Sequence, residues 1–228
     1  MNPILQKQPA YDVAVGQVAR NKVLRNTFWL LALSMIPTVL GAFVGVTMNL
    51  ALPGGFMGFI VMMAVLFGFM YAIEKTKESA LGVVLLLAFT FVMGLLLAPL
   101  LRHTLGYSNG GSLIMTAFGG TAVVFAVMAS IATTTKRDFS GMGSWLMAGA
   151  VVIILAIVAN IFLQMTALSI VISLLMIGVF SAFILYDVQR VVNGGETNYI
   201  TATLAIYLDV FNVFTALLRL LGIMGGDD

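Results

Sequence analysis

Hydrophobic residues fall into long runs separated by short polar breaks along most of the chain. A helix of about 20 residues, rising 1.5 Å per residue, crosses a hydrocarbon core of roughly 30 Å. Seven runs of about this length are predicted to be transmembrane helices: residues 28–50, 56–73, 80–101, 112–132, 144–164, 167–186 and 199–221. The preceding residues 1–26 are largely polar and are expected to form an arm outside the membrane, with residues 27–228 forming the transmembrane domain.

The boundary between the fifth and sixth runs rests on a break of two residues, Met165 and Thr166. An unbroken helix over residues 144–186 would be about twice as long as a bilayer is thick. Two separate helices are therefore predicted there.

Composition narrows the class of protein further. Hydrophobic residues make up 61% of the chain and charged residues only 9%, whereas soluble domains carry roughly 25% charged residues. The absence of cysteine excludes disulfides, thiolate metal sites and a cysteine nucleophile. A net charge of +2 gives no indication of a nucleic-acid partner. The expected protein is an all-α integral membrane protein in contact with the lipid bilayer, not an enzyme and without a cofactor.

Lysine and arginine are distributed unevenly between the two sides of this predicted topology. Placing the amino terminus inside puts nine basic residues inside, namely Lys7, Arg20, Lys22, Arg25, Lys75, Lys77, Lys136, Arg137 and Arg190, against Arg102 and Arg219 outside. Cytoplasmic loops carry the excess of basic residues, so a cytoplasmic amino terminus is predicted. Seven crossings place the carboxyl terminus outside, and a last helix that re-enters would place it inside.

Asp209 lies in the middle of the last apolar run, in the stretch AIYLDVFNVF. An aspartate at the centre of a membrane helix costs roughly 2.5–3.5 kcal/mol on insertion scales and nearly always faces a bundle interior or water. Steps of three or four residues place small and polar residues on one stripe of this helix: Ala202, Ala205, Asp209, Asn212, Ala216 and Arg219. The last helix is therefore predicted to pack inside the others, with Asn212 and Arg219 as supporting polar residues.

Asp187, in the stretch ILYDVQR, lies near the inner end of the sixth run. Position alone favours an interfacial ion pair with Arg190 at i+3. Helical rise puts Asp187 about 7 Å from the end of its helix and Asp209 about 16 Å into the next one, so contact between them requires tilt, a kink or an unwound start. Two carboxylates that meet in a poorly hydrated site share one proton and sense pH. When both are ionised, they suit a hard cation such as Ca²⁺.

Four stretches resemble one known family: KVLRNTFWLL, FGGTAVVFAVMA, LMAGAVVIILAIVANIFLQ and GGETNYITATLAIYLDVFNVFTALLRLLG. They resemble the Bax inhibitor (transmembrane Bax-inhibitor-motif) family, and within it the bacterial YccA-like branch. The resemblance implies six helices around a central, carboxyl-terminal seventh. It also implies that Asp187 and Asp209 fall on the positions of a hydrogen-bonded, pH-sensing pair that controls a calcium leak in better-studied members.

The resemblance also has departures. Members with that chemistry can carry an arginine in the second helix that interacts with the pair, whereas residues 56–73 contain no basic residue. The YccA-like branch implies a bacterial inner membrane protein that is a partner, substrate and modulator of the membrane-anchored ATP-dependent protease FtsH. Its cytoplasmic amino terminus is engaged by the protease, and residues 1–26 could serve in the same way.

The sequence therefore leaves two main hypotheses and a third that is disfavoured. The first is a pH-sensitive cation leak, with calcium as the transported ion, and the second is a membrane-embedded partner of a protease. The third is an intramembrane aspartyl protease, because those enzymes also place an aspartate after a tyrosine in a sixth helix. Their second aspartate follows Gly-x-Gly, whereas Asp209 follows Ile-Tyr-Leu, which argues against this class.

Overall fold

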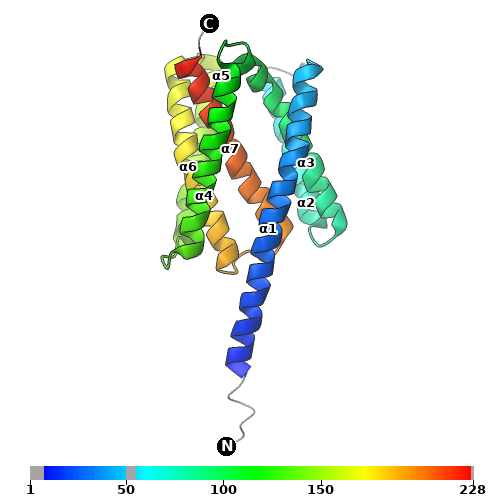
Figure 1. The fold of residues 1–228 in the computed structure, drawn as a ribbon. Coiled ribbons are helices and arrows are strands. Elements are labelled where there is room, and N and C mark those ends of the chain that lie inside the picture. Colours follow the sequence, from blue (N-terminus) through cyan, green and yellow to red (C-terminus); the bar gives the residue numbers. More distant parts are fainter. Residues whose placement is uncertain (1–7, 50–54, 227–228) are drawn as a thin grey trace, which may run out of the picture.

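The structure, a computed structural model, is a bundle of seven long α-helices and describes residues 8–49 and 55–226 (Figure 1). The chain order is α1 (Gln8–Thr47), α2 (Gly55–Thr76), α3 (Ala80–Leu105), α4 (Gly110–Thr134), the short 3₁₀ turn η2 (Ser140–Met142), α5 (Gly143–Leu163), α6 (Thr166–Val192) and α7 (Tyr199–Gly225). The amino and carboxyl ends lie at opposite ends of the bundle.

Six segments of the described residues are long and apolar enough to cross a membrane: Arg20–Thr47, Ala80–Leu105, Gly110–Thr134, Ser140–Leu163, Thr166–Val192 and Tyr199–Gly225. Each contains most of one predicted run. The remaining run, residues 56–73, lies within α2, several of whose side chains fall outside the described residues, so a seventh crossing stays a prediction.

The first helix begins earlier than the sequence pattern predicts. It starts at Gln8 rather than at residue 28, so residues 8–26 of the predicted arm continue the membrane helix and project from the bundle (Figure 1). Hydropathy locates the apolar part of a helix, but polar residues with adequate helix propensity extend it into water. Pro9 stands in the first turn, where proline is tolerated. Residues 1–7, with Lys7, lie outside the described residues, as do residues 50–54.

The break between the fifth and sixth runs is confirmed. α5 ends at Leu163, Gln164 takes a left-handed conformation with φ 51°, and α6 begins at Thr166. Asn160 holds the turn because its Oδ1 accepts a hydrogen bond from the Met165 amide at 3.0 Å, while its Nδ2 donates to Ser169 Oγ at 2.7 Å.

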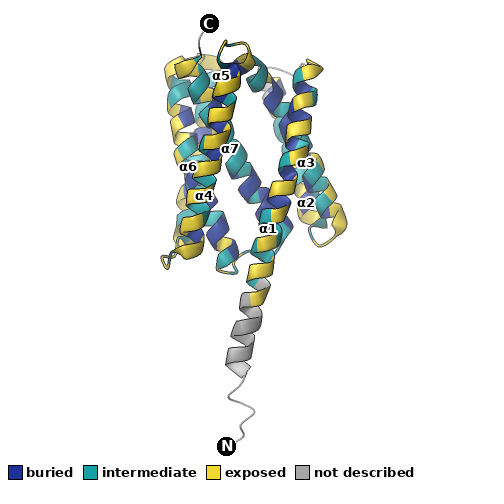
Figure 2. Cartoon of the chain, in the orientation of Figure 1, coloured by how far each residue is buried: buried dark blue, intermediate teal, exposed yellow. Residues whose placement is uncertain are grey.

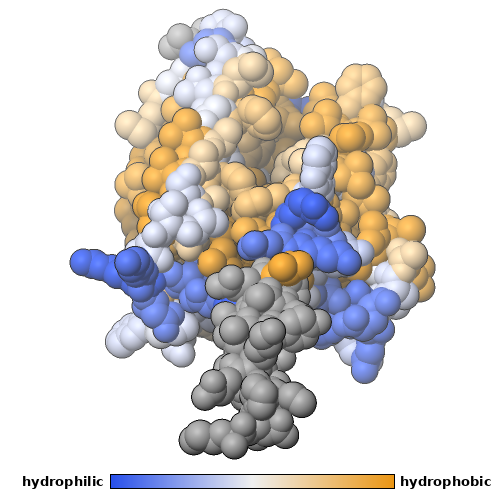
Figure 3. All heavy atoms as spheres, turned by 60° about the horizontal axis from the view of Figure 1, so that its bottom comes forward, coloured by the Kyte–Doolittle hydropathy of each residue, from blue (hydrophilic) through white to orange (hydrophobic). Residues whose placement is uncertain are grey.

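The outer surface of the bundle is apolar, as expected for a protein in lipid. Exposed positions follow the outward faces of the helices (Figure 2), and they include large apolar side chains such as Phe43, Phe118 and Leu155. Contiguous apolar surface on this scale is typical of membrane contact. Hydrophilic residues gather instead around the base of α1, at the end from which the amino terminus leaves (Figure 3).

Helix α7 runs obliquely through the bundle (Figure 1) and packs against α1, α2, α3, α4 and α6. α5 packs mainly against α6, and its backbone makes no close approach to α7 within the described residues. The predicted arrangement of six helices around a central seventh is therefore incomplete on the α5 side. Tyr207 anchors α7 on the opposite side, because a hydrogen bond of 2.8 Å joins its Oη to Thr38 Oγ1 of α1.

Glycines allow α1 and α3 to cross in close contact. A Cβ atom at Gly94 of α3 would collide with the Thr38 carbonyl oxygen, and one at Gly41 of α1 would collide with the Phe91 carbonyl oxygen. Gly41 and Gly45 form a GxxxG motif, which brings membrane helices together because small residues let backbones approach. This crossing fixes Thr38, the residue that binds Tyr207.

We predict that Gly94→Ala destabilises the bundle by about 1–3 kcal/mol, because the added methyl group meets backbone atoms that cannot rotate away. Gly119→Ala in α4 is the matched control, since its Cβ would meet nothing within 4 Å. Thermal unfolding in detergent should show a lower Tm for Gly94→Ala and an equal or higher Tm for Gly119→Ala. Equal Tm values in the two variants would contradict the close crossing.

Candidate functional site

Asp187 of α6 and Asp209 of α7 meet inside the bundle, where their carboxyl groups lie close enough to interact. Asp209 is 5% exposed, and the Asp187 side chain is 12% exposed. An ionised carboxyl group has acceptors but no donor, so a hydrogen bond between two of them requires a proton on one. Asp209 Oδ2 is buried with no hydrogen-bond partner among the described residues.

Two geometric features bring the aspartates together across the offset that helical rise predicts. α7 is oblique, so each residue along it gains less depth than in an upright helix. The Cα–Cβ bonds of a helix tilt toward its amino terminus. α6 and α7 are antiparallel, so Asp187 and Asp209 tilt toward each other along the bundle.

Arg190 supplies the positive charge nearest to the pair. Its Nη1 lies 3.8 Å from Asp187 Oδ1, and its Nη2 lies 3.5 Å from Glu196 Oε2. The Arg190 side chain is 43% exposed, so each of these ion pairs is partly screened by solvent and weak. Asp187 thus interacts with Arg190 as well as with Asp209, and the role of the aspartate pair as a pH sensor stays a prediction.

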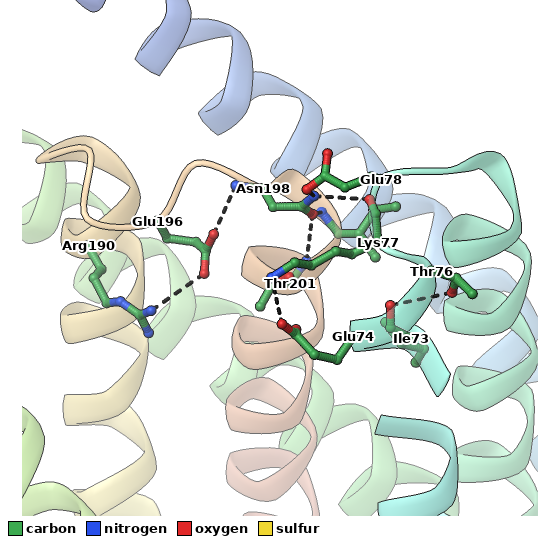
Figure 4. A network of polar contacts seen from close by, with 10 residues as sticks. Ile73, Glu74, Thr76, Lys77, Glu78, Arg190, Glu196, Asn198 and Thr201 are labelled. Carbon is green, nitrogen blue, oxygen red and sulfur yellow. Dashed lines mark hydrogen bonds and ion pairs between the residues drawn. The ribbon is translucent and has the colours of Figure 1, made fainter. Parts of the chain in front are cut away.

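Asn198 connects this site to the start of α7 and to the turn between α2 and α3 (Figure 4). Its Oδ1 caps α7 by accepting hydrogen bonds from the amides of Ile200 at 2.9 Å and Thr201 at 3.2 Å. Its Nδ2 donates to the Lys77 carbonyl oxygen and to Glu78 Oε1, both at 3.0 Å. The Asn198 amide donates to Glu196 Oε1 at 2.9 Å, which completes a polar chain from the aspartate pair to α2.

Asn212 and Arg219 do not join the pair. Asn212 Nδ2 donates to the Leu208 carbonyl oxygen of its own helix at 2.8 Å. Arg219 is exposed and forms no ion pair with any residue that the structure describes. The predicted stripe is therefore buried at Asp209 and Ala216 and reaches the surface at Arg219.

Comparison with known proteins identifies the family. The family profile described as "Inhibitor of apoptosis-promoting Bax1" matches residues 20–226. The chain belongs to the Bax inhibitor family. It is 38% identical over 210 residues to the Escherichia coli K12 protein named "Modulator of FtsH protease YccA", an alignment that covers 92% of this chain and 94% of that protein. The predicted membership and the YccA-like similarity are confirmed.

Two further relatives of this Bax inhibitor family member are uncharacterized proteins. An uncharacterized protein of Neisseria meningitidis serogroup A is 36% identical over 222 residues, covering 96% of this chain and 98% of the relative. An uncharacterized membrane protein of Vibrio cholerae is 36% identical over 208 residues, covering 91% and 92%. The similarity extends over nearly the full length of each protein.

Gln189 is a buried residue of the site that sequence reasoning missed. Its Oε1 accepts a hydrogen bond from the Phe139 amide at 2.7 Å, and its Nε2 donates to the Arg137 carbonyl oxygen at 2.6 Å. This amide ties the loop between α4 and α5 to α6, two residues beyond Asp187. The sequence signal is weak, because a glutamine near a helix end usually faces water, whereas Gln189 is buried.

The site offers few ligands to a resident metal ion. No group of three or more His, Cys, Asp or Glu side chains that could hold a metal occurs in residues 8–49 or 55–226. Asp187 and Asp209 supply carboxylate oxygens, whereas Ca²⁺ takes six to eight oxygen ligands. A calcium ion at the pair would therefore need carbonyl oxygens or water as well.

We predict that Asn198→Ala destabilises the protein by about 0.5–2 kcal/mol, because α7 loses its cap. Asn198→Asp retains the acceptor for the Ile200 and Thr201 amides but loses the donor to Lys77, so its Tm should fall between those of wild type and Asn198→Ala. Asn193→Ala, at an exposed position in the same connection, is the control and should leave Tm unchanged. Identical Tm values for Asn198→Ala and Asn193→Ala would rule out this anchoring role.

Proposed function

We propose that this protein is a pH-sensitive cation leak channel, with Ca²⁺ as the transported ion, gated by Asp187 and Asp209. The observation that carries the proposal is a pair of neighbouring, largely buried carboxyl groups inside a membrane helix bundle. Ionisable residues inside a membrane bundle commonly mark ion or proton pathways. The family resemblance assigns the same role to the matching positions of other members.

The gating step follows from the charge of the pair. A shared proton lets one carboxyl group donate to the other and holds α6 against α7. Without it, two like charges about 4 Å apart repel by about 4 kcal/mol at an effective dielectric constant of about 20. That repulsion favours separation of the helices or the arrival of a cation.

Few charged groups modify this step. Arg190 pairs with Asp187 and with Glu196, and the two aspartates act on each other. Among the described residues, no ion pair joins either carboxyl group to α1, α2, α3, α4 or α5. The pH response should therefore belong to the connection between α6 and α7.

We predict pH-dependent calcium flux into liposomes that contain the purified protein and a calcium-sensitive dye. Asp187→Asn and Asp209→Asn should each abolish the pH dependence, because an amide retains hydrogen-bonding capacity but does not titrate. Asp138→Asn is the control, since Asp138 is an exposed carboxylate in the loop between α4 and α5. Wild-type protein without flux, or both pair variants with the wild-type pH response, would refute the proposal.

A second function, modulation of an FtsH-type membrane protease, is favoured by two different observations. A relative with 38% identity is named a modulator of FtsH protease, and α1 extends as a helix from Gln8 beyond the bundle (Figure 1). In this proposal the protein lies in the bacterial inner membrane with its amino terminus in the cytoplasm, where the projecting helix meets the protease. Neither proposed function is enzymatic.

We predict that deleting residues 2–17 abolishes co-purification with an FtsH-type protease and leaves calcium flux unchanged. The deletion retains Arg20, whose side chain lies close to Gly194 in the connection between α6 and α7. A control variant replaces residues 2–17 with a Gly-Ser segment of equal length. It keeps the chain length but removes the helix, so loss of co-purification in this variant too would show that the helix itself is recognised. Undiminished co-purification after the deletion would exclude the projecting helix as the binding element.

A further inference from the structure

Arg25, Phe28 and Trp29 form a shallow, open pocket of about 340 Å³ on α1. Their spacing of three and four residues places them on one face of the helix. Trp29 is 73% exposed, and the Phe28 ring packs edge-on against Phe125 of α4, with centroids 5.9 Å apart. The pocket is therefore bounded by aromatic rings on its apolar side and by a guanidinium on its polar side.

The pocket lies at the boundary between lipid headgroups and hydrocarbon. About 20 residues of helix fill a hydrocarbon core of roughly 30 Å, so a core that ends at Thr47 begins near Phe28. Arg25 and Lys22 precede Phe28 in α1 and so lie beyond that boundary. Hydrophilic residues gather around the base of α1 (Figure 3). Tryptophan at this depth is typical of membrane interfaces.

The positive charge of the pocket meets no acidic partner among the described residues. Arg25 forms no hydrogen bond or ion pair with any residue that the structure describes. Residues 18–47 of α1 contain no Asp or Glu, so this part of the helix offers no carboxylate to the ammonium of a zwitterionic lipid. Lys22 adds a second positive charge one turn away. A ligand with net negative charge and an apolar body complements this surface.

We propose that the pocket binds an anionic phospholipid, with its phosphate on the Arg25 guanidinium and an acyl chain against Phe28 and Trp29. A guanidinium matches a phosphate through two parallel hydrogen bonds, and the rings give the chain a flat apolar surface. The site is independent of the aspartate pair and of both proposed functions, because neither uses these three side chains.

The two tryptophans of the chain, Trp29 and Trp145, provide a reporter and an internal control. Trp145→Phe leaves Trp29 as the fluorophore, and Trp29→Phe leaves Trp145, which is 82% exposed. Each variant is reconstituted in phosphatidylcholine vesicles that contain a minor fraction of brominated phosphatidylglycerol or of brominated phosphatidylcholine. Quenching then reports which lipid lies beside each tryptophan.

Brominated phosphatidylglycerol should occupy the Trp29 site about fivefold more strongly than brominated phosphatidylcholine, the preference expected for one basic residue at an anionic surface. Arg25→Gln in the Trp145→Phe background should remove the preference. Lys22→Gln also removes one positive charge, but outside the pocket, and should retain most of the preference for phosphatidylglycerol at Trp29. Trp145 should show no preference between the two lipids.

Equal quenching of Trp29 by both lipids, or a preference that survives Arg25→Gln, would overturn the proposal. Quenching of Trp29 by neither lipid would also overturn it, because another protein or a second copy of the chain would then cover the pocket. All variants are compared at matched size-exclusion profiles, so a misfolded variant is recognised before the lipid measurement.

Discussion

The burial of Asp209 beside Asp187 constrains the rest of the bundle. A carboxyl group at the centre of a membrane helix must be shielded from lipid and needs a polar partner. α7 therefore lies inside the bundle, and α6 passes close enough for Asp187 to reach it. Three features hold Asp209 inside the bundle: the tilt of α7, the Asn198 cap at its start, and its packing against five other helices.

The two sides of α7 are built differently. On one side, the carbonyl oxygen of Thr38 in α1 lies against Gly94 of α3. The Thr38 hydroxyl group is hydrogen-bonded to the Tyr207 hydroxyl group. That junction is closely packed and uncharged, so a change of protonation does not alter it. On the other side, contact with α6 includes the aspartate pair. In the proposed gating, a change of protonation therefore moves α6 relative to α7, with α1, α3 and α7 moving as one body.

The sequence was informative where a single physical rule decides the outcome. Hydropathy located the apolar runs, and the bilayer thickness placed a break at Met165. The insertion cost of Asp209 required an inward-facing residue. The contact between Asp209 and Asp187 depends on the tilt of α7 and on the direction of the two side chains. Residue spacing along a single helix gives neither of these. Arg219 illustrates the same point. Periodicity places it on one stripe with the buried Asp209, yet Arg219 is exposed at the surface.

Two further features could not be read from the pattern of apolar residues. Residues 8–26 were expected to lie apart from the membrane helix, yet they continue it, because hydropathy measures the fit to lipid rather than helix formation. The separation of α5 from α7 depends on how α6 lies between them, and the amphipathic pattern of α5 does not encode that arrangement.

The position of Arg190 has a consequence for how the pair responds to its surroundings. An arginine in the second helix would join the pair to α2, and release would then require α2 to move. Arg190 instead stands three residues from Asp187 on the same helix and interacts with both Asp187 and Glu196. The Arg190 charge therefore moves with α6. Its second ion-pair partner, Glu196, lies in the connection between α6 and α7. In the proposed gating, the protonation equilibrium is set by α6, α7 and the six residues between them, and Asn198 joins this hairpin by hydrogen bonds to the turn that follows α2.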